Sequence, residues 1–195
     1  MIRPRLPGPT KGLAIGLLGG SFNPAHEGHL LVAQTALKRL KLNAVWWVVA
    51  RGNPLKSDHG DYTKRLTSAR AMARSAGMKV TDIEDQIGLT YTVDTVRALI
   101  KAAPDARFVW LMGTDNLANF HLWKNWEDIA RMLPIAAIAR PGAPITRAST
   151  FSRRFAASRL PDAQAAHLAR TQAPAWIYLR VRENPISSTA LRAGA

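Results

Sequence analysis

The sequence predicts an α/β protein built on a doubly wound parallel sheet. Apolar segments of strand length alternate with helical segments along most of the chain. Ala44 to Ala50 reads AVWWVVA, a continuous β-favouring segment that is typical of a parallel strand buried on both faces. A glycine-rich turn joins the first strand, Leu13 to Leu18, to a first helix, Leu30 to Leu40. A strand, a helix and a second strand in this order imply a right-handed crossover.

Length and composition indicate one domain. The chain has 195 residues and 47% hydrophobic content, which is enough for one substantial core. Residues 1–11 hold three prolines and three basic residues with little to bury, so we expect a mobile leader followed by a single domain over residues 12–195. We expect that domain to end in a small portion of helix and strand.

No apolar segment predicts a membrane span. Such a span needs about 18 to 20 apolar residues, and Leu13 to Leu18 is far shorter. Its basic flank resembles a signal peptide, but Gly-Gly-Ser-Phe-Asn-Pro follows where a cleavage site would stand. We therefore interpret this segment as a first strand and expect a cytoplasmic protein without a membrane partner.

The charge balance predicts attraction to polyanions in general. Lys and Arg number 27 against 13 Asp and Glu, a formal charge of +14, which would attract ATP, nucleic acid or anionic lipid. One hypothesis is therefore a nucleic-acid-binding module. Such a module needs aromatic stacking platforms or a reading motif, and the sequence has neither, so we expect no specific nucleic-acid partner. The absence of cysteine excludes disulfides and thiolate chemistry. We make no prediction of oligomeric state.

The remaining elements follow from periodicity and from the positions of glycine and proline. The predicted strands are Lys79 to Ile83, Arg107 to Met112, Pro134 to Ala139 and Ala175 to Val181. The predicted helices are Tyr62 to Ala76, one from about Thr92 to Ala102 with Thr92 as its N-cap, and Phe151 to Gln172 with an interruption at Pro161.

The turn from Gly19 to His29 is the strongest candidate for chemistry. Gly19 and Gly20 can adopt positive φ and let the backbone approach a ligand. Unpaired amides at the helix start suit phosphate oxygens, and His26 and His29, three residues apart, would share one face of the first turn. The alternative is a plain turn with surface histidines. In a doubly wound sheet this turn is expected at the topological switch point.

Two motifs carry a resemblance to a known family. Residues 19–29, GGSFNPAHEGH, resemble the signature GGSF(D/N)PxHxGH of the nicotinate and nicotinamide mononucleotide adenylyltransferases, with every position filled. Residues 186–192, ISSTALR, resemble a second signature of that family. The dinucleotide motif GxGxxG and the P-loop motif are absent from this turn, which argues against a dehydrogenase and a P-loop kinase.

The resemblance spans residues 13 to 192 and implies a Rossmann-like sheet of the nucleotidyltransferase type. It implies an enzyme of NAD biosynthesis that transfers the adenylyl group of ATP to nicotinate mononucleotide, giving deamido-NAD and pyrophosphate. The alternative within this chemistry is another acceptor, such as nicotinamide mononucleotide or phosphopantetheine. Because no cluster of carboxylates suggests a protein metal site, we expect Mg²⁺ to arrive with ATP.

The resemblance also implies site residues. The catalytic pair would be His26 and His29. The residues expected to bind ATP and its phosphates are Gly19, Gly20, Ser21, Phe22, Lys56, Ser187, Ser188, Thr189 and Arg192. Those expected to bind nicotinate mononucleotide are Tyr91, Thr92, Gly113, Asp115, Trp123 and Lys124.

Simpler alternatives remain for several of these residues. Lys56 is as well explained as a solvated loop lysine, and the hydroxyls near Thr189 as a helix cap. Two tryptophans three residues apart ordinarily pack on a core, and we expect this of Trp126. The match to the family, and not the residue type, places Trp123 on the ligand.

Overall fold

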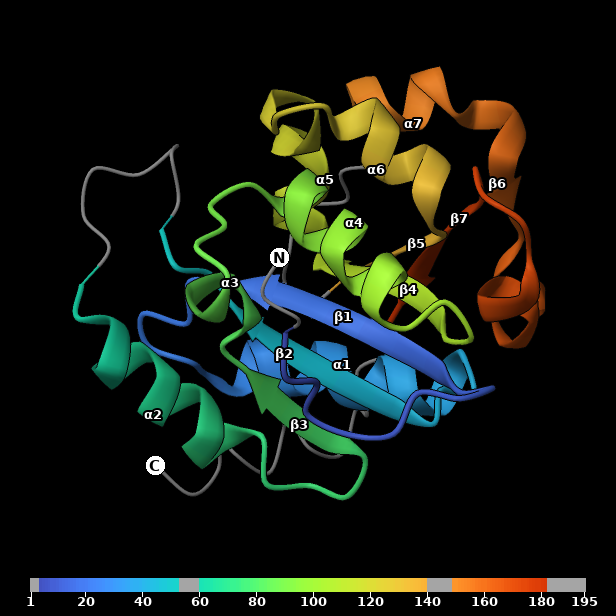
Figure 1. The fold of residues 1–195 in the computed structure, drawn as a ribbon. Helices are drawn as coiled ribbons and strands as arrows, with labels where there is room; N and C mark the ends of the chain where they lie inside the picture. The colour runs from blue at the N-terminus through green and yellow to red at the C-terminus, as the bar shows by residue number, and fades with distance from the viewer. Residues whose placement is uncertain (1–3, 53–59, 140–148, 182–195) are drawn as a thin grey trace, which may run out of the picture.

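The computed structural model describes residues 4–52, 60–139 and 149–181, and within them the chain forms a parallel sheet with helices on both faces (Figure 1). Seven strands in this part of the chain pair in the order β3-β2-β1-β4-β5-β7-β6. The strands are β1 (Ala14–Gly20), β2 (Ala44–Val49), β3 (Met78–Thr81), β4 (Arg107–Gly113), β5 (Ile135–Ala139), β6 (Arg159–Leu160) and β7 (Trp176–Arg180). The predicted α/β class with a doubly wound parallel sheet is confirmed.

The helices connect successive strands and cover the two faces of the sheet. The α-helices are α1 (Glu27–Arg39), α2 (Tyr62–Met72), α3 (Ile83–Gln86), α4 (Thr92–Ala102), α5 (Thr114–Asn119), α6 (Trp126–Met132) and α7 (Thr150–Arg154). The 3-10 helices are η1 (Phe120–Leu122), η2 (Ala156–Ser158) and η3 (Asp162–Arg170).

The hydrophobic core consists of two layers, one on each face of the sheet. Along β2, Trp47 belongs to the layer under α1 and α2, whereas Trp46 and Val48 belong to the layer under α4 and α6. Successive side chains of a strand point to opposite faces. Both faces are covered, which explains why the sequence of β2 is apolar at every position.

The order of the strands creates the crevice in which a ligand can bind. From β1 the chain proceeds to β2 and β3 on one side, and from β4 it proceeds to β5 on the other. β1 and β4 are neighbours, with Ile15 opposite Phe108. In sheets of this kind ligands bind beyond the carboxyl ends of the strands at such a switch point. The histidine turn follows β1 and therefore lies at the switch point, as predicted.

Several element boundaries differ from the prediction. The first helix begins at Glu27, before the predicted Leu30, because His26 caps it. The third strand ends at Thr81, and the next residues form the short helix α3, with acidic residues in its first turn where they suit the helix dipole. The predicted helix Tyr62 to Ala76 ends at Met72.

The predicted helix from Phe151 to Gln172 is wrong in its type. Helix α7 ends at Arg154, and the chain then forms η2, the strand β6 and η3. Leu160 aligns with Ile177, so β6 extends the edge of the sheet beside β7. Pro161 follows at once and has no amide to donate, which suits the end of an edge strand.

The described part of the leader lies against the domain. Arg5 donates its amide to the Gln86 side chain and accepts a hydrogen bond from it, and Leu6 packs on the core layer under α4. The mobility of residues 1–11 and the boundary at residue 12 stay predictions. Among the described residues, none of the helices is long and apolar enough to cross a membrane.

Candidate active site

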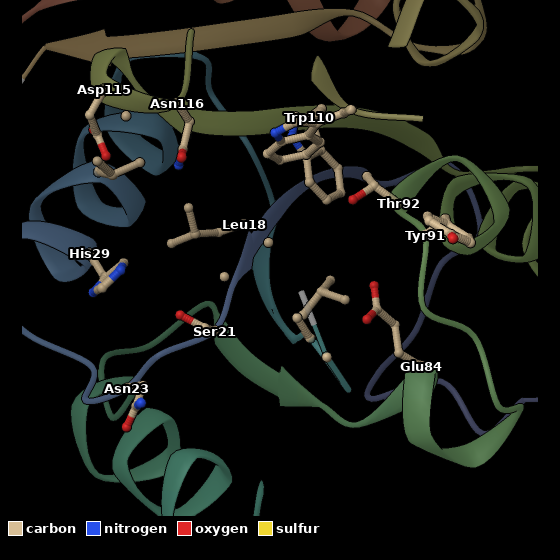
Figure 2. A pocket seen from close by; sticks show the side chains of 18 of the residues that line it. Leu18, Ser21, Asn23, His29, Glu84, Tyr91, Thr92, Trp110, Asp115 and Asn116 are labelled. Atoms are coloured by element: carbon tan, nitrogen blue, oxygen red, sulfur yellow. The ribbon is translucent and has the colours of Figure 1, made fainter. Parts of the chain in front are cut away.

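A cavity of about 610 Å³ opens at the carboxyl ends of β1 and β4. Figure 2 shows His29 and Asn23 on one side of it and Glu84 and Thr92 on the other. The cavity brings together predicted residues from four segments of the chain. These are Gly19, Gly20, Ser21, His26, His29, Tyr91, Thr92, Gly113, Asp115, Trp123 and Lys124.

The two histidines are held by hydrogen bonds within their own turn. His26 is the N-cap of α1, and its Nδ1 accepts from the amide of Gly28 at 3.1 Å. The amide of His26 donates to Nδ1 of His29 at 3.3 Å, which completes a reciprocal capping arrangement. An imidazole nitrogen that accepts carries no proton, so the ring proton of each neutral histidine is on Nε2. The ring centroids are 3.9 Å apart, and both rings line the cavity.

This capping changes the predicted role of the backbone. The amide of Gly28 donates to the His26 ring, and the amide of His29 donates to the His26 carbonyl at 2.8 Å. These two amides are therefore paired within the protein, so they are not the unpaired amides that the prediction expected to meet phosphate. The imidazoles of His26 and His29 line the cavity and can donate from Nε2.

The glycines of the turn serve packing and not a left-handed backbone. Neither Gly19 nor Gly20 has a positive φ, so that prediction is wrong, and Phe22 adopts φ 50° instead. A Cβ on Gly19 would lie 2.5 Å from the Trp110 ring, so only glycine lets that ring lie beneath the turn. Phe22 does not line the cavity, because its side chain is fully buried and packs edge-on against the His29 ring at 5.0 Å.

The opposite side of the cavity is formed by the start of α4. The N-cap is Tyr91 and not Thr92 as predicted, and the Tyr91 side chain makes no capping hydrogen bond. Thr92, the first residue of the helix, lines the cavity. The first amides of a helix have no carbonyl partner within the helix, so this start suits an anionic oxygen. Lys124 Nζ lies 4.0 Å from the centre of the Tyr91 ring and adds a positive charge.

Aromatic side chains form the wall between α4 and the turn. Trp123 is half-buried and packs edge-on against Trp110, with centroids 6.1 Å apart, and against Phe120 at 5.3 Å. Both tryptophans line the cavity. Trp126 instead packs on Phe151 in the core layer, as predicted.

The residues after β4 complete the cavity near the histidines. Gly113 is the N-cap of α5, and the Asp115 carboxylate lies against its Cα, where a Cβ would collide with it. Figure 2 shows Asp115 and Asn116 on the same side as His29. A carboxylate and a carboxamide beside paired imidazoles can orient hydroxyl groups or ordered water.

Sequence reasoning missed Glu84, Trp110 and Asn116 as cavity residues. Glu84 is only 4% exposed, and burial raises the pKa of its carboxyl to about 7, although hydrogen bonds from Thr95 and Arg51 and the charge of Arg65 oppose that rise. The sequence did contain a signal for Glu84, because this acidic residue directly follows a predicted strand. The carboxyl ends of parallel strands lie at the same edge of the sheet, where ligands bind. Trp110 lies within a strand, where its type alone indicates core.

Five predicted site residues lie outside the described part of the chain. They are Lys56, Ser187, Ser188, Thr189 and Arg192. Their assignment to the ATP phosphates stays a prediction.

Comparisons with known proteins cover most of the chain. Residues 17–194 match the family model described as cytidylyltransferase-like. A probable nicotinate-nucleotide adenylyltransferase from a Caulobacter species is 50% identical over 183 residues, covering 92% of this chain and 97% of that protein. One from Methylorubrum extorquens is 47% identical over 184 residues, covering 92% of this chain and 99% of that protein.

The fold is also similar to a solved structure. Plasmodium falciparum nicotinic acid mononucleotide adenylyltransferase, complexed with NaAD, matches with a TM-score of 0.66 and 17% identity, over 92% of this chain and 83% of that chain. At that identity the match describes the fold. The chain belongs to the nicotinate-nucleotide adenylyltransferase family of cytidylyltransferase-like enzymes.

Proposed function

We propose that the chain transfers the adenylyl group of ATP to nicotinate mononucleotide in this cavity, giving deamido-NAD and pyrophosphate in NAD biosynthesis. The observation that carries the proposal is the placement of His26 and His29 in one cavity with Thr92 and Trp123. Relatives at 47% and 50% identity named for this activity support it. The two histidines suit a phosphate, whereas Thr92 and Trp123 suit an aromatic ring with an anionic substituent.

The histidines act on the charge that moves during the reaction. A phosphate oxygen of the mononucleotide attacks the α-phosphorus of ATP. A new phosphorus–oxygen bond forms while the bond to the bridging oxygen breaks, and pyrophosphate leaves with that electron pair. The Nε2–H groups of His26 and His29 donate hydrogen bonds to the α-phosphate and the leaving group, where negative charge grows. Donors that are fixed before the reaction lower its barrier without reorganisation.

The start of α4 selects the acid over the amide. The amides near Thr92 can donate to a carboxylate, whereas an amide substituent presents an NH₂ group that also donates. Donors that face donors in a partly desolvated site leave groups unsatisfied. Trp123 stacks on the pyridine ring and Lys124 adds charge, so the acid is bound with both its ring and its charge matched.

Mg²⁺ enters with ATP in this proposal. Among the described residues, no group of three or more His, Asp or Glu lies close enough to hold a metal ion. When bound with ATP, the ion would supply charge neutralisation on the triphosphate.

We also propose that the reaction takes place in the cytoplasm. The apolar segment that could have served a signal peptide is β1, a central strand of the sheet whose side chains are buried. Removing it would destroy the sheet.

Release of pyrophosphate tests the proposed function. The purified protein is given ATP and Mg²⁺ with nicotinate mononucleotide, with nicotinamide mononucleotide or with no acceptor, and the dinucleotide product is identified by mass. We expect pyrophosphate and deamido-NAD in equal amounts with the acid. No release above the sample without acceptor would overturn the proposal. Release with the amide alone would overturn the choice of acceptor and keep the chemistry.

A further inference from the structure

We propose that Glu84 is a positioning residue for the mononucleotide. Its carboxylate fixes the start of α4 against the residues that follow β2. The inference rests on the proposed function, because it takes the start of α4 as the site of the pyridine ring. Glu84 belongs to neither of the family signatures in the sequence, and its carboxylate points toward the cavity beside Thr92 (Figure 2).

The carboxylate of Glu84 joins three segments that are distant in the sequence. Its Oε1 accepts from the Thr95 hydroxyl of α4 at 2.8 Å, and its Oε2 accepts from the Arg51 amide after β2 at 3.0 Å. Glu84 itself lies in α3. Burying an ionisable group is costly unless its hydrogen bonds are satisfied. Both oxygens are satisfied here, and they are satisfied by the two segments whose spacing defines this side of the cavity.

Thr95 transmits this attachment to the residues that face the ligand. It lies in the first turn of α4 and is fully buried. Its amide donates to the Tyr91 carbonyl at 3.2 Å, and its hydroxyl lies 3.3 Å from the same oxygen. Tyr91 and Thr92 therefore cannot shift relative to β2 without breaking a bond to Glu84 or to Thr95.

Arg65 holds the same peptide segment from the other side. Its side chain is buried, and it donates to the carbonyls of Ala50 at 2.7 Å, Arg51 at 3.1 Å and Ser21 at 2.9 Å. Residue 51 thus has its carbonyl bound by a cation and its amide bound by an anion. The contact with Ser21 continues this chain of hydrogen bonds to the histidine turn, so the two sides of the cavity are set relative to each other.

The hydrogen bonds predict that glutamine can replace Glu84 but alanine cannot. A glutamine oxygen can accept from the Arg51 amide while its NH₂ donates to the Thr95 oxygen. The Thr95 hydroxyl can then donate to the Tyr91 carbonyl, which already lies at 3.3 Å. Glu84→Gln therefore keeps the positions and removes the charge, whereas Glu84→Ala removes both connections.

Steady-state kinetics on four variants test the inference. For Glu84→Ala we expect the KM for nicotinate mononucleotide to rise about tenfold or more, because it loses two hydrogen bonds to a charged group, while kcat and the KM for ATP change less than about threefold. Glu84→Gln should restore the KM to near the wild-type value. Thr95→Val breaks the same connection from α4 and serves if the alanine variant does not fold. Asp85→Asn is the control, because this exposed acid of the same helix pairs with the Arg51 side chain, at 3.6 Å, on the surface.

Three results would overturn the inference while the wild type remains active. One is an unchanged KM for the mononucleotide in both Glu84→Ala and Thr95→Val, another is an equal rise in both KM values, and the third is a glutamine variant as impaired as the alanine variant. Absence of turnover in the unmutated protein would instead overturn the proposed function, and this inference with it.

Discussion

The starts of α1 and α4 lie on opposite sides of one cavity and are built in opposite ways. At α1, His26 and His29 cap the helix with each other, so the bonds that orient them come from the same turn. At α4, the N-cap Tyr91 makes no capping bond, and Thr95 is held from outside by Glu84. A helix that caps itself presents side chains to a ligand, whereas one that is held from outside can present its amides.

This difference separates two functions. The two histidines of the self-capped turn are bonded to each other within that turn, which suits groups that stabilise charge in a transition state. The start of α4 depends on α3, on the exit of β2 and on Lys124 above Tyr91, which suits recognition of a particular substrate. We therefore expect chemistry to depend on the histidine turn and specificity to depend on the start of α4.

The largest expected effect is on turnover when His29 is replaced. For His29→Ala we expect kcat to fall by about 10² to 10³, equivalent to about 3 to 4 kcal/mol, since one donor to the growing charge is lost. The KM values should change much less. Single-turnover and steady-state rates measure the effect.

A matched variant separates catalysis from capping. His29→Gln keeps an acceptor at the third position of the helix, as capping boxes require, and replaces the ring-held Nε2–H by an NH₂ group on a flexible side chain that is not fixed toward the phosphate. We expect His29→Gln to lose turnover like the alanine variant but to keep the wild-type free energy of unfolding. For His29→Ala we expect that free energy to fall by about 1 kcal/mol. If either variant keeps the wild-type kcat, the turn is only a structural turn.

The next largest effect concerns the buried acid beside α4. Burial raises the pKa of Glu84 to about 7, above its ordinary value of 4.5. Between these values the folded protein holds a proton that the unfolded chain has released, so the free energy of unfolding falls as pH rises through this window. The difference between the two pKa values corresponds to a loss of about 3 kcal/mol in the free energy of unfolding.

Glu84→Gln should abolish this part of the pH dependence. Denaturant unfolding at pH 5 and pH 8 should show the wild type losing stability relative to the glutamine variant as the pH rises. Parallel stability profiles would mean that Glu84 titrates in its ordinary range and is not desolvated.

A smaller effect is expected from the aromatic wall. Trp123→Ala should weaken the binding of both the acid and the amide mononucleotide by about tenfold, because stacking on the ring is lost. The preference for the acid should largely remain, because the amides of α4 are unchanged. Trp126→Phe, a substitution in the core that keeps an aromatic ring, is the control. A loss of preference in Trp123→Ala would move specificity from the start of α4 to the tryptophan.

The smallest expected effect is weak binding of nucleic acid, which involves neither side of the cavity. With a formal charge of +14, the protein should bind nucleic acid weakly at low salt, and this binding should disappear as salt rises. Electrophoretic mobility shifts over a salt series measure it. Tight, sequence-preferring binding at physiological salt would instead favour the nucleic-acid-binding hypothesis.

The same contrast explains what sequence could predict. The histidine turn is contiguous, so the motif, its place after β1 and the roles of its side chains follow from neighbouring residues. The doubly wound class followed from the alternation of elements. The capping could not be predicted, because histidine is not a usual N-cap residue and the expected ligand of the amides was a phosphate.

The start of α4 was only half predictable. Tyr91, Thr92 and Trp123 were found through the resemblance, but Glu84 acts through bonds to residues 11 and 33 positions away. Likewise, Trp110 reaches the cavity because Gly19 leaves room for its ring, and that contact joins the neighbouring strands β4 and β1, which are distant in the sequence. Local patterns cannot contain such pairings.

The most direct test of the division between the two sides is the ratio of kcat/KM for nicotinate mononucleotide to kcat/KM for nicotinamide mononucleotide, measured in the wild type and in His29→Gln. We predict a ratio of at least about ten in the wild type, since an unsatisfied donor in the pocket costs about 1 to 3 kcal/mol. The same ratio should persist in the variant while both efficiencies fall together. A wild-type ratio near one, or a ratio that collapses in His29→Gln, would contradict the assignment of chemistry to one helix start and specificity to the other.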